Sequence, residues 1–130
     1  MQLSELVAEW MKYSRTDAEV ARQLYETMHP RPLEIICYHA QQSAEKSLKA
    51  FLVQNNITPP KIHDLNNLLE LCKNIDDEFT QLAASCAKLN NYSSMPRYPF
   101  EIEIFEADAE TAINKAFEMH EWVAKWIITR

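Results

Sequence analysis

Glycine is absent from this chain of 130 residues. That absence excludes every loop that wraps a phosphate with closely spaced glycines, including the Walker-type and dinucleotide-binding fingerprints. Helices commonly end on a glycine in the left-handed backbone region, and asparagine is the usual substitute. Asparagines occur where we expect helices to stop, at Asn55, Asn56, Asn74, Asn90 and Asn91.

Long apolar runs are also missing, because no stretch approaches the roughly 20 residues that cross a bilayer. The first residues show no basic segment followed by an apolar one. Three cysteines, Cys37, Cys72 and Cys86, form no close pair, which favours buried thiols over disulfides. No pair of histidines, cysteines or carboxylates has metal-ligand spacing. We therefore expect a cytoplasmic protein with no membrane segment, no metal and no cofactor.

Basic residues are scarce in one part of the chain. Residues 101–121 carry seven acids against Lys115 alone, which accounts for the whole net charge of −6, while the remainder holds 12 acids and 12 bases. Strong nonspecific binding to a nucleic-acid backbone is therefore not expected.

Apolar residues recur at helical spacing along most of the chain. The spacing and the capping residues predict helices over about 3–28, 33–54, 64–73 and 106–128, with another capped by Asp76 or Asp77. The two prolines within residues 92–105 predict an extended loop there. We expect one domain over residues 1–130, with an all-α fold, an antiparallel up-and-down bundle of four to five helices.

The predicted helix over 33–54 carries two contrasting faces. One stripe is small or apolar and predicts close approach of another helix: Ile36, Ala40, Ser43, Ala44, Ser47 and Phe51. A second stripe is polar: Tyr38, Gln42, Glu45 and Lys49, with His39 and Lys46 beside it. This polar stripe is either a solvated face or a site for a polar ligand. Asp17 lies on the apolar face of the first helix, so we predict that a cation, Lys46 or Arg97, compensates it.

Three short motifs occur in order along the chain. Gln42, Glu45, Lys46, Leu48, Lys49 and Ala50 form the first, His63-Asp64-Leu65 the second and Arg97-Tyr98-Pro99 the third. Together they resemble the HEPN family of helical domains over nearly the whole chain. The resemblance implies a helical bundle that forms homodimers and often acts as the partner of a minimal nucleotidyltransferase, in a toxin–antitoxin-like pair.

The resemblance also raises a catalytic alternative, because some HEPN domains are metal-independent ribonucleases with an Arg-(four to six residues)-His motif in the C-terminal half. Here the next histidine after Arg97 is His120, outside that spacing. The one match, Arg22 to His29, lies in the N-terminal half. We therefore assign no catalytic residue and predict a binding module for a nucleotide or for an anionic segment of a partner protein. The expected ligand-binding residues are His39, Gln42, Glu45, Lys46, Lys49, His63, Arg97 and Tyr98.

Two alternatives remain open at this stage. A divergent ribonuclease would need His39 or His63, together with Arg97, to replace the missing motif. In a purely structural interpretation, the polar stripe forms a network that sets the register of a dimer. His39 fits equally well as a donor facing a ligand and as a buried, hydrogen-bonded imidazole.

Overall fold

A computed structural model describes residues 2–93 and 103–129 of the chain. Within them the chain is helical, without strands, which confirms the predicted all-α bundle. The elements are α1 (Leu3–Thr27), α2 (Leu33–Gln54), α3 (Leu65–Ile75), the 3₁₀ helix η1 (Asp77–Leu82), α4 (Ala83–Leu89), the 3₁₀ turn η2 (Asn90–Tyr92) and α5 (Glu106–Thr129).

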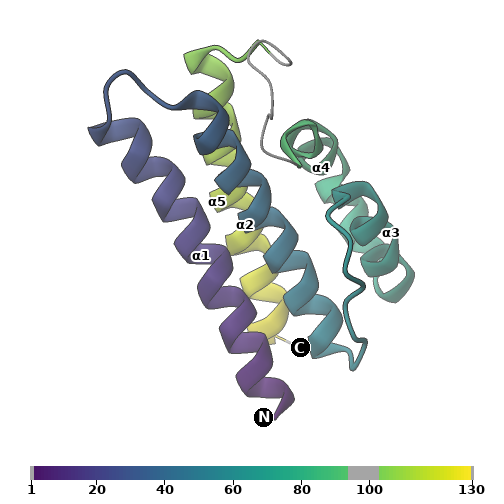
Figure 1. The fold of residues 1–130 in the computed structure, drawn as a ribbon. Helices are drawn as coiled ribbons and strands as arrows, with labels where there is room; N and C mark the ends of the chain where they lie inside the picture. The colour runs from purple at the N-terminus through teal and green to yellow at the C-terminus, as the bar shows by residue number, and fades with distance from the viewer. Residues whose placement is uncertain (1, 94–102, 130) are drawn as a thin grey trace.

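Helix α2 lies at the centre of the bundle. Figure 1 shows α1 antiparallel to α2 on one side, α5 behind α2, and α3 with α4 on the other side. The small stripe of α2 is fully buried, as its composition predicts, and Ala40 and Ala44 pack in one core with Ala18 and Ala21 of α1. Small side chains allow this close helix contact, because they leave little volume between the two backbones.

The ends of α2 and α3 follow the capping residues. Asn56, just after α2, has φ 61°, the left-handed conformation that glycine would otherwise supply. Asp64 caps α3 by accepting a hydrogen bond from the Asn67 N–H, and residues 55–64 form the linker between the two helices. Together these two ends determine where the linker leaves α2 and enters α3.

The predicted fourth helix is instead split into η1 and α4. Phe79 and Leu82, three residues apart, are both buried in the core. A 3₁₀ helix repeats every three residues and so aligns this pair on one side, which gives a physical reason for the tighter turn. Asp76 caps η1 by accepting a hydrogen bond from the Glu78 N–H.

An aromatic cluster fills the core beside the second half of α2. The Phe79 ring lies 4.1 Å from that of Phe51, 4.8 Å from Trp122 and 5.6 Å from Trp126, measured between ring centres. Trp122 and Trp126 are therefore packed together in this cluster. Phe105, which directly precedes the first residue of α5, is 60% exposed.

The three thiols are completely buried, as predicted. Burial raises the pKa of Cys37, Cys72 and Cys86 to about 12 each, because the thiolate loses its hydration. Among the described residues, no helix is long and apolar enough to cross a membrane.

Candidate ligand site on the outer edge of α2

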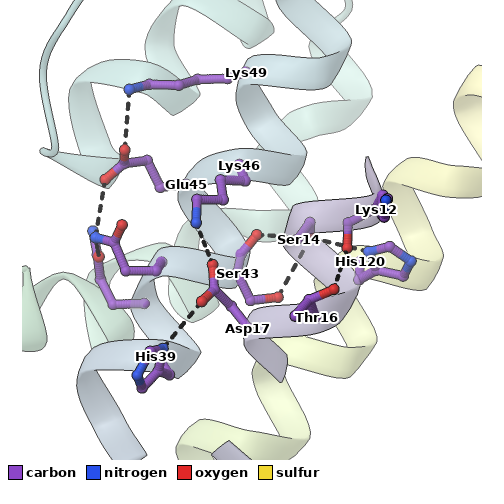
Figure 2. A network of polar contacts seen from close by, with 12 residues as sticks. Lys12, Ser14, Thr16, Asp17, His39, Ser43, Glu45, Lys46, Lys49 and His120 are labelled. Atoms are coloured by element: carbon purple, nitrogen blue, oxygen red, sulfur yellow. Dashed lines mark hydrogen bonds and ion pairs between the residues drawn. The ribbon is translucent and has the colours of Figure 1, made fainter. Parts of the chain in front are cut away.

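The first polar cluster joins α1 to α2 around Asp17. Its Oδ2 accepts a hydrogen bond from Lys46 Nζ at 2.5 Å, and its Oδ1 lies 3.0 Å from His39 Nδ1 (Figure 2). Burial alone would raise the pKa of the Asp17 carboxyl, but the hydrogen bonds from His39 and Lys46, with their charges, hold that pKa below 3.8. The expected contact between Asp17 and Lys46 is present. Because an ionised carboxylate only accepts, the His39 proton lies on Nδ1, which leaves Nε2 as the second ring nitrogen.

The second cluster joins α2 to the linker around Glu45. Its Oε2 accepts a hydrogen bond from Lys49 Nζ at 3.0 Å, and its Oε1 lies 3.0 Å from His63 Nδ1. The lysine and glutamate side chains are only 8% and 4% exposed, whereas His63 is 66% exposed. Gln42 Nε2 reaches Glu45 Oε1 at 3.5 Å, the long end of hydrogen bonding. This cluster therefore has a buried ion pair and an exposed imidazole.

The two clusters share one pattern, since each carboxylate holds a lysine on one oxygen and an imidazole on the other. With both imidazoles neutral, the clusters carry no net charge. With both imidazoles protonated, they carry two positive charges. The polar groups along α2 therefore carry nearly equal numbers of positive and negative charges and do not form a simple basic patch. Their affinity for an anion depends on which N–H donors point toward solvent.

The structure brings six of the eight predicted site residues to the same side of α2, namely His39, Gln42, Glu45, Lys46, Lys49 and the neighbouring His63. Arg97 and Tyr98 lie outside the described residues. Glu45 and Lys49 are buried rather than solvated, because Trp10 of α1 lies beside Lys49 and His63 of the linker contacts Glu45. His39 and Lys46, at 28% and 25% exposure, form the open part.

Gln41 is a structural member of this site that the predicted set does not contain. It is fully buried; its Nε2 donates to the His63 carbonyl at 2.9 Å, and its Oε1 accepts from Gln42 at 2.9 Å. Gln41 therefore fixes the backbone that carries His63. The sequence offers one signal for this role: Gln41 is an amide on a helix face that otherwise points to the core, and it adjoins Gln42.

Aromatic rings of α1 border the lysines. Lys46 Nζ lies 5.9 Å from the centre of the Tyr13 ring, and Lys49 Nζ lies 5.8 Å from that of Trp10. Both distances are within the range of cation–π attraction. Tyr13 is 51% exposed and Trp10 is half-buried, so the open edge of α2 has an aromatic border as well as cationic groups.

A third polar network lies behind the site, where α1, α2 and α5 meet. Ser14 Oγ donates to the Ser43 carbonyl at 2.8 Å and lies 3.0 Å from His120 Nδ1 (Figure 2). Since the only hydroxyl proton of Ser14 is used on Ser43, His120 donates from Nδ1. Burial, followed by the charge of Arg15, lowers the pKa of His120 below 6.5 and favours this neutral form. These groups are buried and hydrogen-bonded, so they hold the three helices together.

The chain is related in sequence and in fold to a known family of helical domains. The model of the HEPN domain family matches residues 7–126, so the chain belongs to the HEPN family. The fold is also similar to the crystal structure of ST0689, described as an archaeal HEPN homologue, with a TM-score of 0.72 and 26% sequence identity. That match covers 93% of this chain and 97% of the other. A search of curated proteins found no match.

Proposed function

We propose that this HEPN domain is a cytoplasmic binding module that holds the phosphate groups of a nucleotide on the outer edge of α2. The supporting observation is the pair of lysine–carboxylate–imidazole clusters along α2, in which His39 and Lys46 are partly exposed and His63 is exposed. Fixed cations that retain free donors are the usual means of binding phosphate.

Lys46 and His39 are the groups that meet the phosphate. An ammonium group has three N–H donors, and Lys46 uses one of them on Asp17. His39 adds a donor at Nε2 when it is protonated, while Asp17 keeps its ring oriented through Nδ1. Asp17 therefore positions both cationic groups, and the phosphate binds to their outward donors without displacing the carboxylate.

Isothermal titration calorimetry with a nucleotide panel tests this proposal. Lys46→Gln should weaken binding at least tenfold, because it removes one charge-assisted contact of about 1.5–3 kcal/mol. Lys73→Gln is the matched control, since Lys73 also pairs with a carboxylate and is similarly exposed, at 27%. Equal affinity of the Lys46→Gln variant and the control, or no heat with any nucleotide, would contradict the proposal.

We further propose that the domain works as a homodimer and as the partner of a minimal nucleotidyltransferase in a toxin–antitoxin-like pair. Met28 and Phe105 expose large apolar side chains, at 52% and 60%. They lie at the same end of the bundle, where Arg31 of the α1–α2 loop pairs with Glu106 at the start of α5. Exposed apolar surface of this kind often marks protein contacts.

Light scattering at micromolar concentration tests the dimer, and Phe105→Glu should shift it toward monomer. A monomeric wild-type protein would contradict this part of the proposal. The partner is tested by co-purification with a minimal nucleotidyltransferase encoded beside this gene. If the two proteins elute separately at micromolar concentration, the partnership is excluded.

RNA cleavage is a second candidate function, favoured by one observation. Asp17 orients His39 and Glu45 orients His63 through Nδ1, which leaves each Nε2 available to move a proton. An imidazole oriented by a carboxylate is the usual general base for activating a hydroxyl. Purified protein should then cleave RNA without added metal, and His39→Ala or His63→Ala should abolish cleavage. No cleavage at high protein concentration would exclude this candidate.

A further inference from the structure

A mainly apolar pocket lies at the end of the α1–α2 pair where the chain begins. Its volume is about 230 Å³, and it is lined by Leu3, Leu6, Trp10, Val53, Asn56, Ile57, Thr58 and Pro59. Leu3 and Ile57 on its rim are 45% and 38% exposed. The pocket therefore presents apolar surface to solvent, together with one amide and one hydroxyl side chain.

The pocket and the candidate site share one residue, Trp10. Trp10 lines the pocket and its ring also borders the Lys49 ammonium, at 5.8 Å. Lys49 and Lys46 precede the pocket residue Val53 by four and seven residues on α2. At a rise of about 1.5 Å per residue, they lie about 6 Å and about 10 Å along the helix axis from that residue. An apolar end and a row of cations thus follow one another along a single helix.

We propose that the pocket holds the base of the nucleotide and that its phosphate chain runs along α2 toward Lys46. The inference rests on the proposed function and names the ligand as a nucleoside di- or triphosphate. The distance between the pocket and Lys46 favours a di- or triphosphate. A base in the pocket reaches the partly exposed Lys46 only through a chain of more than one phosphate. Lys49 is almost buried, so it contributes positive potential along this path rather than a direct contact.

The lining favours a base over an alkyl chain. Trp10 offers a flat aromatic face, and base–aromatic stacking is a general device that tolerates any base. Asn56 and Thr58 offer hydrogen-bonding groups to the polar edge of a base, which an alkyl chain cannot use. The pocket therefore suits a ligand that is planar, partly polar and joined to an anionic chain.

Calorimetry on the full chain tests the inference with three probes: ATP, inorganic tripolyphosphate and hexyl phosphate. ATP should bind about tenfold or more tightly than tripolyphosphate, the factor expected from stacking one base. A Leu3→Ser/Ile57→Ser variant should erase that advantage and leave tripolyphosphate binding unchanged. Ile35→Ser is the matched control, because Ile35 is as exposed as Ile57 but lies at the other end of α2.

The outcomes separate this inference from the function on which it rests. Equal binding of ATP and tripolyphosphate, unaffected by the pocket variant, overturns the base pocket and leaves phosphate binding intact. Binding of hexyl phosphate as tight as that of ATP also overturns it, because the pocket would then take an alkyl chain. If neither ATP nor tripolyphosphate binds, both proposals fail. Circular dichroism of each variant verifies that it is folded before it is titrated.

Discussion

The ion pair between Lys49 and Glu45 allows a quantitative prediction about stability. In Lys49→Met the aliphatic stem is kept but the ammonium is lost, so the almost completely buried Glu45 carboxylate loses the lysine that pairs with it at 3.0 Å. Removing one member of a buried pair costs about 3–5 kcal/mol. The exposed His63 still holds the other oxygen, which places the loss near the lower value. We therefore expect the free energy of unfolding to fall by about 3 kcal/mol.

A loss of that size lowers Tm by about 10 °C for a domain of this length, so thermal and urea unfolding followed by circular dichroism both detect it. Lys73→Met is the matched control, because its pair with Glu70 is exposed and should cost about 1 kcal/mol or less. The Glu45→Leu/Lys49→Met double variant should recover most of the stability, since it leaves no buried charge. A Lys49→Met loss as small as that of the control would refute this reasoning.

Three further predictions concern the core. Phe79→Ala should lower the free energy of unfolding by about 3–5 kcal/mol, measured in urea, because it empties the centre of the aromatic cluster. His120 has a lowered pKa, so its stabilising contribution is complete above about pH 6.5 and is lost as the pH falls, when the unfolded chain takes up a proton more readily. His120→Gln should flatten this part of the stability profile between pH 7 and 5. Cys37, Cys72 and Cys86 should resist a thiol reagent until the protein unfolds, and rapid labelling of the native protein would contradict their burial.

Much of the fold could be predicted from periodicity and capping residues. The bounds of α2, the Asp64 cap and the left-handed Asn56 agree with what the sequence indicates, because each depends on local chemistry. The 3₁₀ conformation of η1 could not be predicted from the sequence, since its tighter turn depends on tertiary burial of Phe79 and Leu82. Local signals therefore identified the helices but not every kind of turn between them.

The position of the candidate site on α2 could be predicted from the sequence, but the contacts of its residues with neighbouring segments could not. A helical wheel places Glu45 and Lys49 in one stripe of α2 with His39 beside it, but it does not tell which neighbouring segment covers each of them. That coverage comes from α1 and from the non-periodic linker, which carries His63. The division into two clusters, and the supporting position of Gln41, therefore depend on packing that has no sequence period.

The serine contact behind the site has a consequence for the charged groups in front of it. Ser14 and Ser43 bring α1 and α2 together with their hydroxyl oxygens 3.4 Å apart. Asp17 and Lys46 each follow one of these serines by three residues, so the same approach of the two helices places the carboxylate within reach of the ammonium. A larger side chain at Ser43 would act as a wedge and pull the charged partners apart without altering either of them. Two small hydroxyl side chains thus set the spacing of α1 and α2 beside these charged groups.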